Sequence, residues 1–413
     1  MEPMIQKSHF LRRASFGGTL NELNSQTKPD ELLGSWLQRN PRVNVHNLGA
    51  IAKGKDRGKQ TREFSRWLLT QLTSASNPLH EKITNIWRDH FVVSLRTVQL
   101  PQMLTDYELR LRTYALGDFQ ELLWQISTSP AMLRYLDNVQ NQAGKINENF
   151  SREFMELFTL GRGQYSEKDI QEGARALTGW QIKTNQETGT SEALFVTRRH
   201  DQGIKNYLGR SGNFKTEDVV EILANHPSTA RFIGSKLWSA FAYNDPEPEI
   251  VDRLAQVYTQ NKRNISNVVA AIFNSPEFYS TKAYRSHIKN PIYFIVGAVR
   301  QLQIEVDFDK LQGSLRAMGQ TPYNVPSVKG WLGDAGWLTA PSLLTRLNLA
   351  QQMTKDYGDD GGFDFKPDRF SNSDLVTLLL DGQADPSMVQ SFSGLSRREV
   401  TALILSSPTY QLE

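Results

Sequence analysis

The chain has 413 residues, of which 39% are hydrophobic and 22% are charged. These proportions are those of a folded globular protein and exclude an intrinsically disordered chain. The 47 basic and 44 acidic residues are interspersed and leave a net charge of +3. We therefore expect no nucleic-acid or anionic-lipid partner. Cysteine is absent, which excludes disulfides, thiolate metal sites and cysteine nucleophiles.

The N-terminal sequence MEPMIQKSHFLRRASFGG lacks the apolar core of a signal peptide. No apolar segment approaches the roughly 20 residues that a membrane-spanning helix needs. From the chain as given we expect a soluble, cytoplasmic protein with no membrane span. A leader removed from the natural protein would leave no trace in this sequence, so the compartment stays open.

Helical periodicity dominates the chain from one end to the other. Apolar residues recur at i, i+3 and i+4 in segments 21–40, 62–75, 80–94, 103–129, 166–180, 216–226, 228–242, 248–261, 264–275, 290–303 and 340–353. Segment 103–129 contains Gly117-Asp118, which predicts a break between two helices there. The pattern predicts a mainly α fold, a large irregular multi-helix domain spanning 1–413.

Three segments depart from the helical pattern. Residues 192–200 have strand character, and we expect a small β-hairpin or loop insert within 181–215. Residues 324–342 and 355–374 are rich in turn-forming residues and predict long loops. The second loop is acidic but fails the EF-hand template, because Pro367 stands where the last calcium ligand is required. We interpret it as a solvated acidic loop.

The segment NENFSREFMELFTLG, residues 147–161, combines charged and aromatic side chains. A helix from about residue 149 to 160 places Glu153 and Glu156 at i, i+3 on one side. Ser166 is predicted to cap the next helix, where Asp169 and Glu172 are again three residues apart and Arg175 follows. The short connection predicts an antiparallel helical hairpin over 147–180.

Two interpretations of this hairpin stay open. In the first, Arg152 and Arg175 neutralise the carboxylates in a structural salt-bridge network, as buried charges require partners. In the second, the carboxylates hold a divalent metal ion. The metal candidates are Glu153, Glu156, Asp169, Glu172 and His90. Di-iron bundles use Glu-x-x-His, and the missing His counts against that class.

Outside this hairpin the sequence offers few further candidates for a functional site. His200 and Asp201 are adjacent and form a candidate acid–base or ligand pair, or else an ordinary loop turn. His80 and His90 lie about 15 Å apart along one helix, too far to share an ion. Phosphate-binding loops, dinucleotide-binding glycine fingerprints, H-E-x-x-H and G-x-S-x-G are all absent from the sequence.

Several segments together resemble one uncharacterised bacterial family, catalogued as domain of unknown function 1800. They include HFLRRASFGG, HEKITNIWRDHF, the whole run from residue 147 to 180, HDQGIKNYLG and NVPSVKGWLGDAGWL. The resemblance extends from His9 to the last helix. Arg88 stands where the family pattern usually has a His, which weakens a metal site built on His90.

The resemblance implies a mostly helical fold and no established activity. It also implies frequent export, and a partner protein of the sulfatase-like family that is often encoded nearby. Two functions remain. One is an enzyme whose polar pocket contains Glu153, Glu156, Arg152, Arg175, His200 and Asp201 as acid–base groups, ligands or anion-stabilising donors. The other is a non-catalytic binding or assembly protein with paired charges and an exposed apolar patch.

Overall fold

The structure, a computed structural model, describes residues 1–39, 56–185, 187–331, 333–356 and 362–413. Within these ranges the chain forms 21 α-helices and three two-stranded antiparallel sheets. This confirms the predicted mainly α class with small β inserts.

The helices of the N-terminal part are α1 (Pro3–Ala14), α2 (Leu20–Asn24), α3 (Pro29–Gln38), α5 (Arg57–Ser74), α6 (Pro78–His90), α7 (Leu95–Val98), α8 (Pro101–Tyr114), α9 (Phe119–Ser127), α10 (Pro130–Tyr135), α11 (Asn149–Glu156) and α12 (Glu167–Ala176). Those of the C-terminal part are α13 (Thr216–Ala224), α14 (Pro227–Phe241), α15 (Pro248–Gln260), α16 (Ile265–Phe273), α17 (Pro291–Leu302), α18 (Phe308–Ala317), α19 (Ala340–Thr354), α20 (Asn372–Leu380), α21 (Pro386–Ser391) and α22 (Arg397–Ser406).

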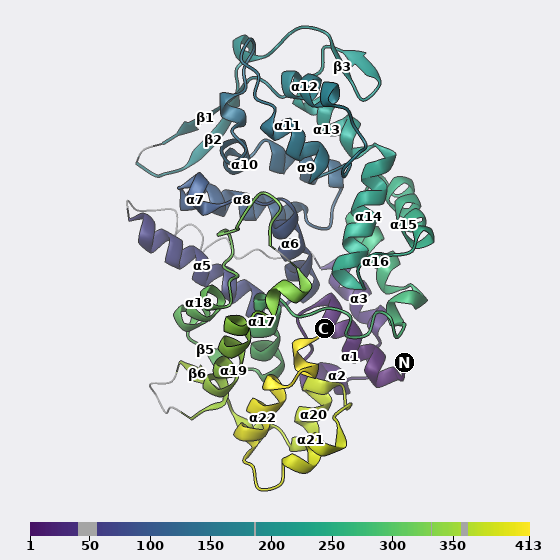
Figure 1. The fold of residues 1–413 in the computed structure, drawn as a ribbon, viewed down its shortest axis with the longest axis vertical. Helices are drawn as coiled ribbons and strands as arrows, with labels where there is room; N and C mark the ends of the chain where they lie inside the picture. Colours follow the sequence, from purple (N-terminus) through teal and green to yellow (C-terminus); the bar gives the residue numbers. More distant parts are fainter. Residues whose placement is uncertain (40–55, 186, 332, 357–361) are drawn as a thin grey trace.

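The predicted insert consists of two hairpins. Strands β1 (Trp180–Thr184) and β2 (Ser191–Phe195) pair with Trp180 opposite Phe195, and β3 (Lys205–Tyr207) pairs with β4 (Arg210–Gly212). In Figure 1 both hairpins lie with α9 to α13 at one end of the molecule, and α20 to α22 lie at the other end. The central helices α6, α8 and α17 lie between them.

The predicted acidic loop 355–374 is more structured than expected. Residues 357–361 lie outside the described residues, but β6 (Phe363–Asp364) pairs with β5 (Glu305–Val306) in a third small sheet. Phe363 and Phe365 are buried. Alternation of buried and exposed residues along this short strand explains why it pairs despite the surrounding Gly and Asp.

The central helix α6 carries polar side chains into the interior. Every one of its residues except Asp89 is buried. Asn77 caps its first turn and Pro78 occupies the first helical position, a combination that favours helix initiation. Ile83 and Trp87 share one side and join the apolar core. The charges of the other sides need partners from neighbouring elements.

One set of partners comes from α8. The Glu108 carboxylate, which is fully buried, accepts hydrogen bonds from Arg88 at 2.7 and 2.9 Å and forms an ion pair with Arg112 at 2.9 Å. Arg112 also binds Glu81. Burial by itself raises the pKa of Glu108, but the two arginines outweigh it and hold this pKa below its usual range.

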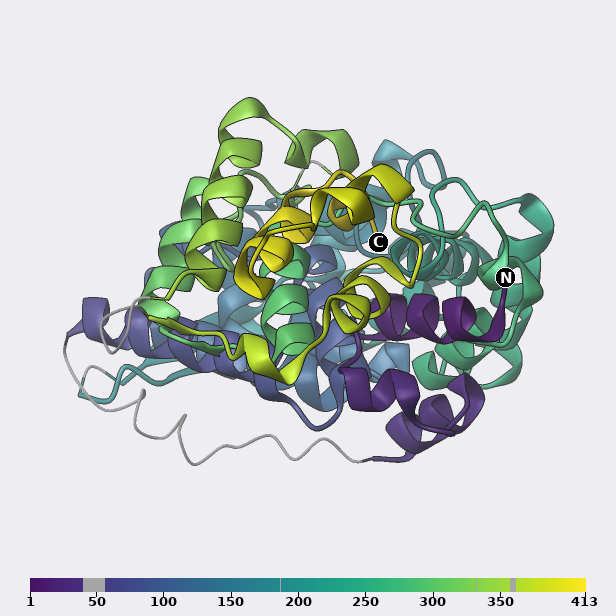
Figure 2. The ribbon, with the colours of Figure 1, turned by 90° about the horizontal axis from the view of Figure 1, so that it is seen from below.

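A second set of partners joins the two ends of the described chain to the centre. Glu413 forms ion pairs with Arg13 of α1 at 3.1 Å and with Lys82 of α6 at 3.4 Å. Asp381, which follows α20, accepts hydrogen bonds from Arg12 and Arg285. Figure 2 accordingly shows α1 beside the C-terminal helices. Ion pairs thus fix the position of α1.

No helix within the described ranges is long and apolar enough to cross a membrane. This agrees with the absence of a long apolar segment in the sequence.

The substitution Glu108→Gln tests the importance of the buried network on α6 and α8. It leaves the buried Arg88 without a full negative partner, and it leaves Arg112 with Glu81 alone, so we expect a loss of about 3–5 kcal/mol of unfolding free energy. Urea denaturation followed by circular dichroism measures it. Asp106→Asn on the same helix is the control. Asp106 forms a partly exposed i, i+4 pair with Arg110, and its loss should cost at most about 0.5 kcal/mol. Equal effects of the two substitutions would contradict this account.

Candidate functional site

The predicted helical hairpin is present, although its first helix is shorter than expected. Helix α11 ends at Glu156 rather than near residue 160, and Leu160 is buried in the following turn. Helix α12 begins after Ser166, which forms the predicted capping box with Asp169. The Ser151 hydroxyl donates a hydrogen bond of 2.8 Å to the Ile170 carbonyl, so the two helices are in direct contact.

Two of the three charged residues of α11, Arg152 and Glu156, have partners close by. Arg152 binds both carboxylate oxygens of Glu167 at 2.9 Å and contacts Glu148 at 3.4 Å. Glu156 accepts hydrogen bonds from Arg162 at 2.7 Å and from the Tyr165 hydroxyl at 3.2 Å. Arg162 in this way holds the pKa of Glu156 below its usual range.

Asp169 and Glu172 of α12 face the second hairpin, whereas Glu167 faces Arg152 of α11. Asp169 accepts a hydrogen bond from the Leu208 amide, and Glu172 accepts one from the Asn206 amide at 2.9 Å. Arg175 binds Glu172 at 2.9 Å. These side chains attach β3 and β4 to α12.

His200 and Asp201 belong to this same attachment. Asp201 binds Arg175 with both oxygens, at 2.8 and 3.0 Å. His200 Nδ1 lies 3.1 Å from the Thr178 hydroxyl, and Nε2 lies 3.5 Å from the buried ammonium of Lys205. Burial lowers the pKa of both His200 and Lys205. The predicted residues therefore divide into a Glu153–Glu156 group and an Arg175–Asp201–His200 group.

His90 lies in an aromatic environment apart from both groups. Its Nε2 lies 3.1 Å from the Phe158 carbonyl, and its ring packs near Phe91, Phe158 and Phe232. Burial lowers its pKa well below the usual range. Among the residues that the structure describes, no group of three or more His, Asp or Glu side chains is arranged to hold a metal ion.

Two further ionisable side chains, Asp89 and Lys236, lie close enough to influence each other's pKa. Asp89, at the end of α6, accepts one hydrogen bond from the described residues, from Asn85 at 3.4 Å. Lys236 of α14 has neither a hydrogen bond nor an ion pair among those residues; its ammonium lies 5.7 Å from the Phe232 ring centre. Both side chains are surrounded by protein but retain partial solvent access.

The loop 324–333 connects this group to α11. Gly330, at φ +77°, packs against α6 so closely that a Cβ atom there would lie 3.2 Å from the Asp89 carbonyl oxygen. Its neighbour Lys329 is close enough to lower the pKa of Glu153 and of Glu156. We call Asp89, Lys236, Glu153, Glu156 and Lys329 the Asp89 cluster.

Three groups of the Asp89 cluster, Asp89, Lys236 and Glu153, have pKa values that burial moves away from the usual ones. Burial raises the pKa of Asp89 to about 6 and lowers that of Lys236 to about 8. Burial, and then the Glu156 charge, raises the pKa of Glu153. The Glu153 carboxylate accepts no hydrogen bond within the described part of the chain. Acidic and basic groups that titrate near neutrality are typical of acid–base sites.

Sequence reasoning identified Glu153 and Glu156 but missed Asp89, Lys236 and Lys329. Asp89 lies in the WRDHF segment and Lys329 in the NVPSVKGWLGDAGWL segment, both of which carry the family resemblance. Their distance along the chain hid their proximity. Lys236 gave no signal, because an isolated lysine in an amphipathic helix is usually solvated.

The protein is therefore mainly helical, with a buried polar network around α6 and the Asp89 cluster beside it. The chain belongs to the family described as Protein of unknown function (DUF1800), whose model matches residues 9–412. The family resemblance found from the motifs is thereby confirmed. Comparison with curated proteins and with solved structures finds no match.

Dialysis against EDTA tests the metal prediction for Glu153, Glu156, Asp169, Glu172 and His90. Because four of these five side chains have hydrogen-bond partners in the protein, we expect an unchanged melting temperature and no stoichiometric metal in elemental analysis. A divalent metal that leaves together with about 5 °C of thermal stability, and is absent from the Glu153→Gln/Glu156→Gln variant, would contradict this expectation.

Proposed function

We propose that the protein is an enzyme that uses Asp89 and Lys236 for general acid–base catalysis on a small polar substrate. The observation that carries the proposal is the placement of these two side chains. They are surrounded by protein, remain partly accessible to solvent and form no ion pair with each other. Buried charges that serve stability are normally paired, as Glu108 and Arg88 are in the same protein.

The roles follow from the protonation states. Near pH 7 the Asp89 carboxylate, with a pKa of about 6, is mostly ionised and acts as the base. The Lys236 ammonium, with a pKa of about 8, is mostly protonated and acts as the acid or as the donor to a developing negative charge. Glu153 belongs to α11 and Lys329 to the loop 324–333, and the two are close enough to interact. Both serve to orient the substrate.

Arg152, Arg175, His200 and Asp201 have a smaller part in this proposal than in the sequence-based prediction. Arg152 and Arg175 are each bound by carboxylates. Their donors are occupied, which leaves little capacity to stabilise an anionic transition state. They support the Asp89 cluster indirectly by holding α11, α12 and the second hairpin together.

A second candidate function, binding of a partner protein, is favoured by a different surface. A groove of about 750 Å³ between α19 and α22 has an apolar part formed by Leu347, Ala402 and Leu403 and a polar edge that includes Arg398 and Glu399. Leu344, on α19 beside it, is 59% exposed. This apolar groove suits an amphipathic helix. We propose as its occupant a helix of the sulfatase-like partner that the family resemblance implies. Calorimetric titration with that purified partner tests it, and Leu344→Asp should lower the affinity at least tenfold.

Stability measurements separate a catalytic Asp89 from a structural one. The pKa of Asp89 is raised in the folded state, so the folded protein binds a proton more tightly than the unfolded chain does. The contribution of Asp89 to the free energy of unfolding is favourable at low pH and is lost as the pH rises from about 4 through 6. Asp89→Asn should therefore stabilise the protein at pH 7.5, by up to about 3 kcal/mol, and the gain should vanish near pH 4. Destabilisation at pH 7.5 would indicate a structural ion pair.

An activity screen tests the catalytic proposal directly. Chromogenic esters, phosphoesters, glycosides and amides are offered to the full chain between pH 5 and 9. We expect turnover of one class with a bell-shaped profile whose limbs lie near pH 6 and pH 8. Asp89→Asn and Lys236→Met should each lower kcat at least about 100-fold. Lys59→Met, at an exposed lysine of α5, is the control. Full activity of both cluster variants would overturn the assignment.

A further inference from the structure

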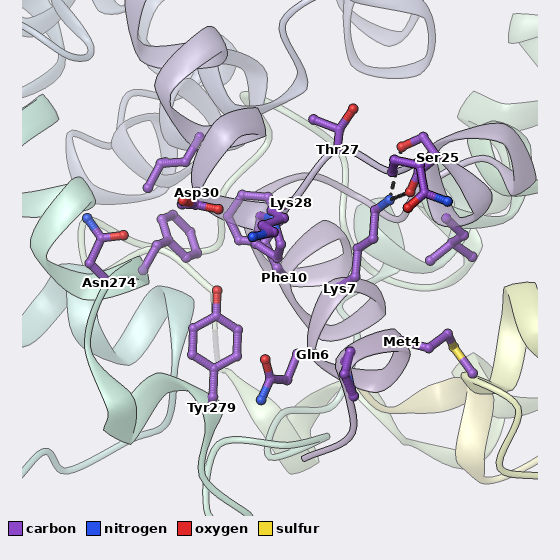
Figure 3. Close-up of a pocket in the computed structure, with 16 residues that line it drawn as sticks. Met4, Gln6, Lys7, Phe10, Ser25, Thr27, Lys28, Asp30, Asn274 and Tyr279 are labelled. Carbon is purple, nitrogen blue, oxygen red and sulfur yellow. Dashed lines mark hydrogen bonds between the residues drawn. The ribbon is translucent and has the colours of Figure 1, made fainter.

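A separate cavity lies at the N-terminal end of the chain, away from the Asp89 cluster. It has a volume of about 550 Å³ and is enclosed by α1, the α2–α3 connection, the start of α3, the end of α16 and Tyr279. This volume falls within the range of small-molecule sites. In Figure 3 Lys7 runs along one side of the cavity to Ser25, and Tyr279 stands on the other side.

The floor of the cavity is apolar and well packed. Phe10, Leu33 and Phe273 line it and are almost completely buried. The Phe10 ring stacks on Trp36 at a centroid distance of 5.6 Å and meets Phe273 edge-on at 5.3 Å. Aromatic rings held in this way form a rigid base beneath the accessible apolar lining residues Pro3, Met4 and Pro29, so little free energy is lost to reorganisation when an apolar ligand binds.

Lys7 places a positive charge in the wall without a negative partner. The residue is only 7% exposed, and its ammonium donates to the Ser25 carbonyl and, at 3.0 Å, to the Ser25 hydroxyl. Both acceptors are neutral, and an ammonium has three donors, so one N–H is left over. Within the described ranges no carboxylate forms an ion pair with Lys7.

Glu22 is an acid whose charge acts on Lys7 but which is held in a helix cap. Glu22 lies close enough to influence Lys7, but its carboxylate accepts hydrogen bonds from the Thr19 amide at 2.7 Å and the Thr19 hydroxyl at 3.1 Å. Both hydrogen bonds go to one Glu22 oxygen, Oε2, and the Glu22 charge acts on Lys7 without forming an ion pair with it. A buried cation that is bound only by neutral oxygens favours an anionic ligand.

Uncharged and charged polar groups surround the rest of the opening. The hydroxyl of Tyr279 and the amide of Asn274 have no hydrogen-bond partner within the described residues and are free to bind polar atoms of a ligand. Lys28 and Asp30 lie at the start of α3 with opposite charges. The arrangement is therefore an apolar floor, a cationic end at Lys7 and a polar end at Tyr279, where the Asp30 carboxylate lies close to the hydroxyl.

We propose that this cavity binds a small apolar molecule that carries one carboxylate, with the carboxylate on Lys7 and the apolar body on Pro3, Met4 and Pro29, above the buried Phe10, Leu33 and Phe273. The site is independent of the Asp89 cluster. The ligand is an aromatic or aliphatic monocarboxylate rather than a sugar or a nucleotide, because the floor offers no hydrogen-bonding groups.

Three isosteric probes test the proposal on the full chain at pH 7.5. They are 4-phenylbutyrate, 4-phenylbutan-1-ol and 4-phenylbutylamine, and NMR titration gives each Kd. We expect the carboxylate to bind about tenfold more tightly than the alcohol and the amine to bind most weakly. Lys7→Met should lower the affinity for the carboxylate to that for the alcohol, while Lys7→Arg should retain the preference.

Two further variants locate the binding. Thr27→Trp fills the cavity from a half-exposed connection and should abolish binding of all three probes, while Lys59→Met on α5 should leave every Kd unchanged. A melting curve for each variant shows that it is folded. Equal affinities for the three probes, undiminished binding to Thr27→Trp, or no binding at millimolar concentration would each overturn the proposal. The comparison within the wild-type protein holds even where Lys7→Met fails to fold.

Discussion

The structure depends on a buried helix, α6, that is polar on several sides. A helix enclosed by protein must pair each charge that it carries. Glu81 and Arg88 are paired by α8, and Lys82 is paired by Glu413 at the end of the described chain. Satisfying these charges forces α8, α1 and the C-terminal segment to meet around α6. The hydrophobic core then fills the space between elements whose relative positions ion pairs specify.

Asp89 stands out against this background because it does not follow the rule. It is the one residue of α6 that is not buried, and its carboxylate lacks an arginine or lysine partner at ion-pair distance in the described structure. Lys236 lies near it without neutralising it. Glu81, Lys82 and Arg88 of α6 are paired, whereas Asp89 and Lys236 of α14 form no ion pair in the described structure. Asp89 lies where the loop at Gly330 packs against α6. Such local departures from the stable arrangement are typical of functional sites.

The helical hairpin over 147–180 illustrates how far local sequence rules reach. The Ser166–Asp169 capping box and the antiparallel helices α11 and α12 follow from short-range patterns and are present. Convergence of Glu153 with Asp169 across the hairpin does not follow from them, because spacing along a helix does not specify its rotation about its own axis. Asp169 faces the Leu208 amide instead. The second hairpin, only broadly expected, and Asp201 before it supply the partners of Asp169, Glu172 and Arg175 on α12.

The sequence by itself determined the mainly α class, the β insert, the family and the absence of cysteine chemistry, since these depend on composition, periodicity and local capping. Only the tertiary structure decided which charges are paired. Asp89, Lys236 and Lys329 come from segments more than 90 residues apart along the chain, and packing of α6, α14 and the loop at Gly330 brings them to one region. A titratable group acquires its pKa from the protein that surrounds it, and that environment exists only once the chain has folded.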